Sequence, residues 1–207
     1  MIDMAGGSAQ LLPLLQPLQQ MTFLCLALIP NGSQHRTPLA AAYATLTASS
    51  KLQHLSLSFS RLPAGTWHHL FLAGRQLPQL RYLDISRVRL PDGTFAPAPT
   101  GSLIVSCCPV VENLMMLELP CSTEVLAPLT ALSMLNSLGT DLSADDSSIG
   151  EIMDALCQLT GLSFLALTGS ADALLLPLTQ LEQLASLHYQ ATPRWAARGV
   201  HLVCTVS

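Results

Sequence analysis

The segment Leu80–Leu90, LRYLDISRVRL, constrains the fold more than any other part of the sequence. Its apolar residues lie at offsets 0, 3, 5, 8 and 10, and the first three of them are Leu80, Leu83 and Ile85. An amphipathic helix would space them three and four residues apart throughout, and a strand with one exposed face would alternate strictly. The spacing therefore predicts a short strand followed by a turn that points back into a core.

The same spacing recurs along the chain, and we call each occurrence a frame, with offsets counted from its first residue. The frames start at Met21, Leu52, Leu80, Val111, Leu132, Leu162 and Leu184, and offset 3 is leucine in all of them. Subtraction of successive starts gives spacings of 31, 28, 31, 21, 30 and 22 residues. This pattern resembles that of leucine-rich repeats, whose units have roughly 20–29 residues. The resemblance implies an α/β fold, a leucine-rich-repeat solenoid of about seven irregular repeats. A curved parallel sheet would form its concave face, with short helices and loops on the convex face.

We expect two regions in the chain. Residues 1–17 form an N-terminal segment, partly disordered or capping the first strand, in which Pro13 and Pro17 interrupt any helix. Residues 18–207 form the repeat domain. Its last part, GVHLVCTV at 199–206, has the character of an edge strand.

Three helices are predicted between the frames. The first has Thr37 as its N-cap and Pro38 at its first position. The second follows Thr66 as a cap and is closed by Gly74. The third begins with a capping box of Ser148 and Glu151. Its apolar stripe consists of Ile149, Ile152, Met153, Leu156 and Leu159.

The segment from 102 to 121 is similar to the cysteine-containing repeats of F-box leucine-rich-repeat proteins. In those repeats a short helix ends in Cys-Pro before the strand, as Cys108 and Pro109 do ahead of Val111. A later cysteine, Cys121, falls at offset 10 where that subclass has it at offset 8. The resemblance implies the substrate-recognition part of a ubiquitin-ligase adaptor.

Two registers are open for this fourth frame, because both place apolar residues at the core positions. One uses Val111, Leu114 and Met116, and the other uses Leu114, Leu117 and Leu119. The choice decides which side chains face outward. We favour the first.

In leucine-rich repeats, which this pattern resembles, offset 8 usually holds an asparagine whose amide forms hydrogen bonds with backbone groups in the turn. Here it holds Ile29, Ser60, Val88, Leu119, Thr140, Ser170 and Thr192. Four of these residues carry hydroxyls, which we expect to serve the same purpose with a single short side chain.

Composition and charge exclude several classes of protein. The longest uncharged apolar run, Met21–Ile29, is far shorter than the roughly 20 residues of a membrane-spanning helix. Nucleic-acid binders carry a basic stripe, whereas this chain has a net charge of −4. Its densest basic cluster consists of Arg75, Arg81, Arg87 and Arg89, is interrupted by Asp84, and is interpreted as solvated. We therefore expect neither a membrane nor a nucleic acid as partner.

The six cysteines favour a cytoplasmic protein with reduced thiols. They form no C-x-x-C motif and no zinc-finger spacing with histidine. An alternative comes from Asn31-Gly32-Ser33, a glycosylation sequon. It favours an extracellular ligand-binding ectodomain fragment, although the start MIDMAGG lacks the basic flank of a signal peptide.

No catalytic constellation is recognisable in the sequence. It contains no G-x-S-x-G, H-E-x-x-H, Walker A or G-x-G-x-x-G motif. His68 and His69 are adjacent on a predicted helix and point about 100° apart, which does not suit one metal. We expect no enzyme activity, cofactor or metal.

The frame also defines a candidate binding surface. Offsets 2 and 4 point away from the leucine core, because side chains alternate along a strand. We expect a non-catalytic protein-protein interaction module with its partner on this concave face. The predicted protein-binding residues are Phe23, His54, Tyr82, Asp84, Met134, Asn136, Phe164 and His188. The alternative is that the Phe95–Thr100 loop or the N-terminal segment covers these side chains.

Overall fold

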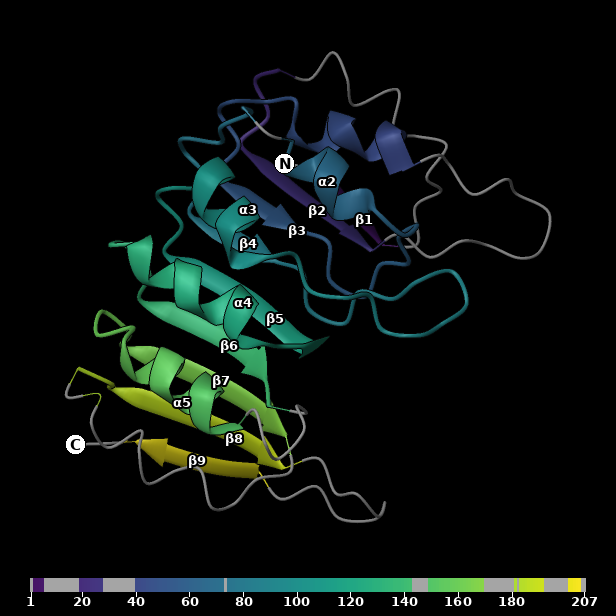
Figure 1. The fold of residues 1–207 in the computed structure, drawn as a ribbon. Helices are drawn as coiled ribbons and strands as arrows, with labels where there is room; N and C mark the ends of the chain where they lie inside the picture. Colours follow the sequence, from purple (N-terminus) through teal and green to yellow (C-terminus); the bar gives the residue numbers. More distant parts are fainter. Residues whose placement is uncertain are drawn as a thin grey trace.

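The computed structural model describes residues 2–5, 19–27, 40–72, 74–142, 149–169, 181, 183–191 and 201–205. These residues form one nine-stranded sheet whose strands follow chain order (Figure 1). The strands are β1 (Ile2–Ala5), β2 (Phe23–Ala27), β3 (His54–Ser56), β4 (Tyr82–Asp84), β5 (Asn113–Pro120), β6 (Ser137–Asp141), β7 (Phe164–Gly169), β8 (Ser186–Ala191) and β9 (His201–Thr205). Neighbours from β1 to β8 are parallel, and β9 is antiparallel to β8. This consecutive parallel stacking is that of a leucine-rich-repeat solenoid.

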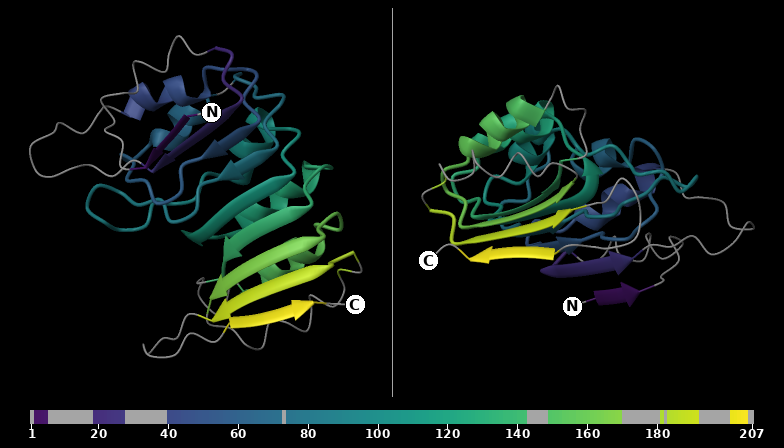
Figure 2. Two further views of the ribbon diagram at one scale, coloured as in Figure 1. Left: turned by 180° about the vertical axis from the view of Figure 1, so that it is seen from behind. Right: turned by 90° about the horizontal axis from the view of Figure 1, so that it is seen from below.

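The described helices lie on one face of the sheet, as the view from below in Figure 2 shows. They are η2 (Ala40–Thr47), α2 (Thr66–Leu70), α3 (Gly101–Cys107), α4 (Thr123–Leu126), η3 (Ala127–Ala131) and α5 (Ile149–Cys157), where η denotes a 3-10 helix. In the part of the chain that the structure describes, the opposite face carries no helix. We call it the helix-free face.

One hydrogen-bond pattern repeats between successive units and fixes their register. The carbonyl oxygen at offset 1 accepts bonds from the N–H groups at offsets 1 and 2 of the next unit. The Gln53 carbonyl, for example, accepts from Arg81 at 2.9 Å and from Tyr82 at 3.1 Å. The same pattern starts from the carbonyls of Thr22, Arg81, Glu112, Asn136 and Ser163.

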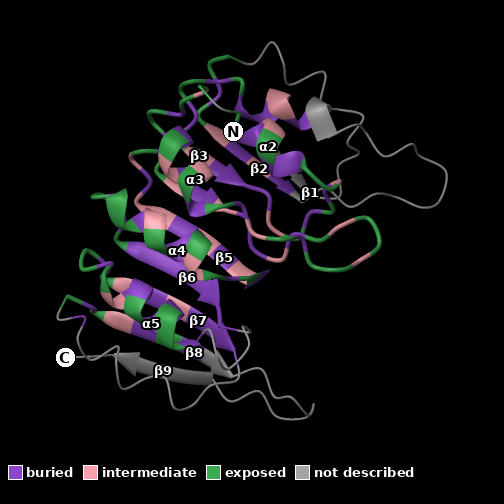
Figure 3. Cartoon of the chain, in the orientation of Figure 1, coloured by how far each residue is buried: buried purple, intermediate pink, exposed green. Residues whose placement is uncertain are grey.

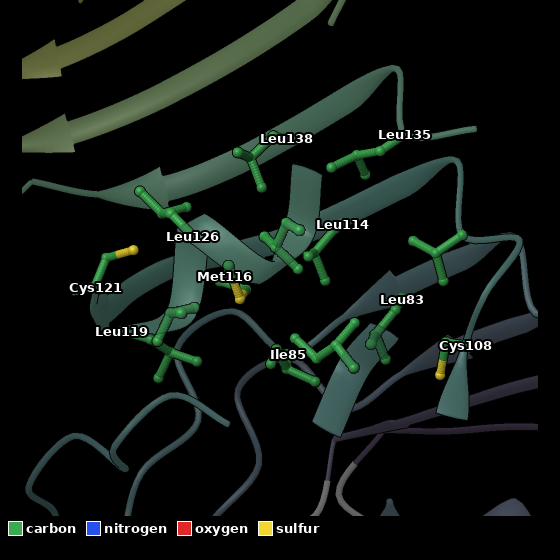
Figure 4. Close-up of a cluster of buried hydrophobic side chains, with 14 of the residues drawn as sticks. Leu83, Ile85, Cys108, Leu114, Met116, Leu119, Cys121, Leu126, Leu135 and Leu138 are labelled. Atoms are coloured by element: carbon green, nitrogen blue, oxygen red, sulfur yellow. The ribbon is translucent and has the colours of Figure 1, made fainter. Parts of the chain in front are cut away.

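This register stacks the offset-3 leucines of neighbouring strands side by side in the core. They are Leu24, Leu55, Leu83, Leu114, Leu138, Leu165 and Leu187, and all are buried. Figure 4 shows Leu83, Leu114 and Leu138 in the same cluster as Ile85 and Met116 of the offset-5 row. Each unit thus buries its leucines against the units before and after it.

The predicted fifth frame is wrong by three residues. Ser137, not Met134, pairs with Asn113 and Phe164, so the frame starts at Leu135 rather than Leu132. Leucines at 132, 135 and 138 are spaced by three, so the sequence permits either start. With this correction the spacing from the fourth frame to the fifth becomes 24 residues instead of 21, and the spacing from the fifth to the sixth becomes 27 instead of 30.

The fourth frame has the register that the sequence favoured. Leu114 pairs with Leu83, and Val111 and Met116 are buried on either side of it. Helix α3 ends at Cys107, and the Cys108 N–H then donates to the Ile104 carbonyl at 2.7 Å. Cys107, Cys108 and Cys121 are all buried.

The helices differ in detail from the sequence prediction. The Thr37 cap and Pro38 lie outside the described residues. The described part that follows, η2, buries Tyr43 and Leu46, whose spacing of three matches a 3-10 helix. Thr66 is the first residue of α2, and the cap position before it is held by Gly65, whose φ is 78°. Helix α2 ends at Leu70, four residues before Gly74, which was predicted to close it.

Helix α5 begins at Ile149, and the predicted cap Ser148 lies outside the described residues. Its predicted apolar stripe is buried from Ile149 to Leu156, and so is Leu159 beyond its end. The amphipathic spacing thus identified the buried face of this helix.

The offset-8 row is mixed. Ser60 is buried and its hydroxyl donates to the Leu26 carbonyl at 3.1 Å, as predicted. Val88 and Leu119 are buried apolar residues of the core. Thr140 moves to offset 5 with the corrected frame, and Ile29, Ser170 and Thr192 lie outside the described residues.

The sheet extends beyond the seven predicted units at both ends. Strand β1 lies within residues 1–17 and pairs with β2, and β9 is the antiparallel edge. The boundary after residue 17 stays a prediction. Among the described residues, no helix combines the length and the apolar character needed to cross a membrane.

Candidate functional site

The helix-free face of the sheet is turned toward the viewer in the left panel of Figure 2. The strand register arranges the side chains of this face in two columns. The offset-2 column is Phe23, His54, Tyr82, Asn113, Ser137, Phe164 and Ser186. The offset-4 column is Cys25, Ser56, Asp84, Met115, Gly139, Ala166 and His188.

Six of the eight predicted binding residues lie in these columns, and two do not. Asn136 is at offset 1, where its carbonyl oxygen accepts from the N–H groups of Ser163 and Phe164. Met134 precedes the corrected frame and is 48% exposed. Ser137 and Gly139 take the places that the sequence prediction gave to these two residues.

Three rings stack along the offset-2 column, and we call Phe23, His54 and Tyr82 the ring ladder. The Phe23 and His54 ring centroids are 4.1 Å apart with planes at 12°, and His54 and Tyr82 are 4.1 Å apart at 2°. Parallel strands about 4.8 Å apart bring residues of equal offset to this spacing. All three side chains are half-buried. The ladder is therefore a rigid strip of rings with part of its surface open.

A fixed carboxylate lies beside the ring ladder. Asp84 Oδ1 accepts from the Ser86 N–H at 3.0 Å, and Asp84 Oδ2 accepts from the Ser56 hydroxyl at 3.3 Å. The Ser56 hydroxyl also lies 3.1 Å from that of Ser58. These contacts hold the negative charge of Asp84 in one place at the end of β4.

The ladder itself is uncharged at neutral pH. Burial lowers the pKa of His54 from its ordinary 6.5, and the charge of Asp84 opposes that shift. Burial raises the pKa of Tyr82, and the charge of Asp84 adds to it. A neutral imidazole and a neutral phenol therefore face solvent next to one negative charge.

A second, smaller ring pair lies across β7 and β8. The centroids of Phe164 and His188 are 5.0 Å apart with planes at 38°. Phe164 is half-buried and His188 is exposed. Asn113 and Ser137 separate this pair from the ring ladder along the offset-2 column, so the rings form two groups and not one stripe.

Met115 is a part of this face that the sequence prediction left out of the site. A Cβ added at Gly139 would lie 2.7 Å from Met115 Sδ, so the Met115 side chain reaches over β6. Strand β6 is buried along its whole length (Figure 3). The absence of a side chain at Gly139 in the offset-4 column is the sequence signal for this packing.

The described contacts of the 95–100 loop lead away from the ring ladder. The Phe95 ring lies under the Arg89 guanidinium at 4.4 Å, and the Trp67 indole N–H of α2 donates to the Pro97 carbonyl at 2.6 Å. Of the N-terminal segment 1–17, the other predicted cover, residues 2–5 form β1 and residues 6–17 lie outside the described residues.

The four arginines that cluster in the sequence do not form one group in the fold. Arg75 donates to the Ala44 carbonyl at 2.7 Å, whereas Arg81 pairs with Glu112 and Arg87 with Glu118. Within the described part of the chain, no group of three or more histidine, cysteine or acidic residues is placed to hold a metal ion.

Comparison with protein-family models gave no match, and neither did comparison with curated protein sequences. Among solved structures, the chain is similar to the crystal structure of an internalin from Listeria monocytogenes at 1.91 Å resolution. The two share 18% sequence identity with a TM-score of 0.44, over 86% of this chain and 51% of the internalin. The chain thus spans about half the length of that protein.

Proposed function

We propose that this chain is a non-catalytic protein-protein interaction module whose partner binds on the helix-free face. The observation that carries the proposal is the ring ladder of Phe23, His54 and Tyr82. Aromatic residues and methionine are enriched in interface cores. The stacked rings lose little conformational freedom on binding, because they are already ordered. Asp84 supplies a fixed charge at the border of this apolar strip.

A narrower role follows from the cysteine-containing repeat. We propose that the module recognises the substrate of a ubiquitin-ligase adaptor in the cytoplasm. Support comes from α3 and its Cys-Pro ending, and from five free cysteines among the described residues. Burial raises the pKa of Cys121 to about 11 and also raises that of Cys108, so both are unreactive core thiols. Reduced core thiols are typical of intracellular proteins.

The extracellular alternative rests on the Asn31 sequon, which lies outside the described residues. Intact mass measured on protein from a eukaryotic host separates the two localisations. A glycan at Asn31 would favour the ectodomain, whereas six unmodified thiols in an unglycosylated chain favour the cytoplasmic module.

Affinity purification with mass spectrometry tests the interaction itself. We compare the wild-type chain, the double variant Tyr82→Ala with Phe164→Ala, and Leu72→Ala as a matched control. Leu72 is an exposed apolar residue that follows α2 on the helix-covered side. We expect a set of proteins that the wild type and Leu72→Ala retain and the double variant loses.

Folding must be checked in the same experiment, because the double variant removes two ring contacts, that of Tyr82 with His54 and that of Phe164 with His188. Each aromatic pair contributes roughly 0.5–1.5 kcal/mol, and we expect the folded domain to tolerate the loss of both. Circular dichroism of each variant verifies this. Proteins retained equally by all three chains would contradict the proposal, and wild-type complexes without ubiquitin-ligase subunits would contradict only the narrower role.

A further inference from the structure

Arginine and phenylalanine side chains gather where the chain leaves β3 and β4. Phe59 and Arg87 both occupy offset 7 of their units, and Arg61 and Arg89 both occupy offset 9. Phe95 joins them through an isolated bridge to Arg89. We call these five residues the arginine-phenylalanine patch. Phe59 is 56% exposed and Phe95 is 40% exposed, and none of the five belongs to the ring ladder.

The backbone at offset 7 is left-handed in three successive units. The φ angle is 62° at Phe59, 57° at Arg87 and 58° at Glu118. Glycine adopts this conformation without strain, whereas a bulky residue does not. Because the conformation recurs at the same offset, it belongs to the turn of each unit, and at Phe59 it holds the ring exposed at the surface.

Two positive charges are held side by side in the patch. The Arg89 N–H donates to the Ser60 carbonyl at 2.9 Å, and the Leu62 N–H donates to the Arg89 carbonyl at 2.8 Å. These bonds put Arg61 and Arg89 in parallel register, about 4.8 Å apart on the same side. Like charges in adjacent positions destabilise a sheet.

The described residues provide no carboxylate that pairs with either of these two arginines. Glu118 pairs with Arg87 at 2.7 Å. The Asp92 carboxylate, in the turn after Arg89, accepts from the Thr94 N–H and hydroxyl. Within the described part of the chain, Arg61 and Arg89 therefore keep their positive charge without an ion-pair partner, although the net charge of the chain is −4.

The rings orient the guanidinium groups. Arg87 lies over the Phe59 ring at 5.0 Å, and Arg89 lies over the Phe95 ring at 4.4 Å and donates to the Gly93 carbonyl at 3.2 Å. A guanidinium that stacks on a ring keeps its N–H edges available for carboxylates. An oriented guanidinium also loses less entropy on binding than a freely moving one.

We propose that the arginine-phenylalanine patch binds an acidic segment of a protein partner, with carboxylates on Arg61 and Arg89 and an apolar contact on Phe59. Arg61 and Arg89 lie about 5 Å apart in adjacent units, and one or two residues of an extended peptide cover this distance. A nucleic acid fits less well, because its backbone usually contacts a long basic stripe, whereas this patch offers only two unpaired arginines. The patch is a second contact surface, and its test does not depend on the ring ladder.

Fluorescence anisotropy with a labelled decaglutamate peptide tests the proposal on the purified full chain. The double variant Arg61→Gln with Arg89→Gln removes both charges. Arg81→Gln is the matched control, since Arg81 is an exposed arginine at the opposite end of β4. We expect saturable binding of decaglutamate that weakens at least about tenfold in the double variant, is unchanged in Arg81→Gln, and falls as salt rises.

Three results would overturn the proposal. Decaglutamine could bind as tightly as decaglutamate, or Arg81→Gln could weaken binding as much as the double variant. A ten-nucleotide oligothymidylate could bind more tightly than decaglutamate and lose its binding in the double variant, which would assign the patch to nucleic acid. Should the double variant fail to fold by circular dichroism, the single variant Arg61→Gln decides. Tyr82→Ala must leave decaglutamate binding unchanged, which separates this test from that of the helix-free face.

Discussion

The Ser60 hydroxyl donates a hydrogen bond to the Leu26 carbonyl oxygen, 3.1 Å away in the preceding unit. Both residues are buried. A buried carbonyl needs a partner, and here a single hydroxyl provides one where other leucine-rich repeats use asparagine. This hydrogen bond therefore connects the turn after β3 with the end of β2 in the preceding unit.

Replacement of Ser60 by alanine should destabilise the chain by about 1–3 kcal/mol, because it leaves the buried carbonyl without this donor. Ser58→Ala is the matched control, since the Ser58 hydroxyl is half-buried and, among the described residues, has the Ser56 hydroxyl as its partner. Urea unfolding of both variants measures the difference. Equal losses in the two variants would mean that the Ser60 bond is not structural.

The corrected fifth frame makes a second prediction. Leu138→Ala should cost about 2–5 kcal/mol, because Leu138 is fully buried in the offset-3 row. Met134→Ala should cost less than about 0.5 kcal/mol, because its side chain is largely exposed. The same unfolding measurement distinguishes them. A larger loss at Met134 would restore the frame that starts at Leu132.

Much of the fold could be predicted, because leucine at offset 3 recurs in every unit and the core requires it. The start of the fifth frame could not, since Leu132, Leu135 and Leu138 satisfy the same spacing when shifted by three. Only the backbone register, with Asn136 at offset 1, resolves the choice. The more even spacings that follow from Leu135 were a usable signal in the sequence.

The candidate site was predictable where it depends on alternation and not where it depends on side-chain size or backbone strain. Phe23, His54 and Tyr82 share an offset, so their proximity follows from register alone. The reach of Met115 over Gly139 depends on a missing side chain one strand away. The left-handed conformation at Phe59 could not be predicted, because phenylalanine does not favour it.

Replacement by alanine should lower the stability of the chain more at Gly101 than at Gly139. A Cβ at Gly101 would lie 2.0 Å from the Val125 carbonyl oxygen, which is backbone of α4 and cannot move alone. At Gly139 the nearest atom is the Sδ of Met115, the flexible end of a side chain. Gly101→Ala should therefore cost about 1–3 kcal/mol or more, and Gly139→Ala clearly less. The reverse order in thermal unfolding would contradict the packing of α3 on α4.

The ring ladder should make stability depend on pH. Burial lowers the pKa of His54, and the charge of Asp84 partly offsets this shift. The His54 imidazole is therefore protonated at a lower pH in the folded chain than in the unfolded chain. The contribution of neutral His54 to stability is fully present above its unfolded-state pKa of about 6.5, and it is lost as the pH falls through its lower folded-state pKa.

The matched variant is His54→Phe, which keeps a ring between Phe23 and Tyr82 but cannot be protonated. Urea unfolding at about pH 7 and pH 5 should show a larger loss of unfolding free energy in the wild type than in this variant. Equal losses in the two chains would mean that His54 does not contribute to the pH dependence.

Site-specific photocrosslinking tests the central claim most directly, because it reports contact at a chosen residue without removing the side chain's bulk. Benzoylphenylalanine is placed at Tyr82 or Phe164 on the helix-free face, or at Leu72 on the helix-covered side. After irradiation with proteins retained in the affinity purification, we predict partner adducts from positions 82 and 164 and none from position 72. Adducts from position 72 alone would contradict the assignment of the binding surface to the helix-free face.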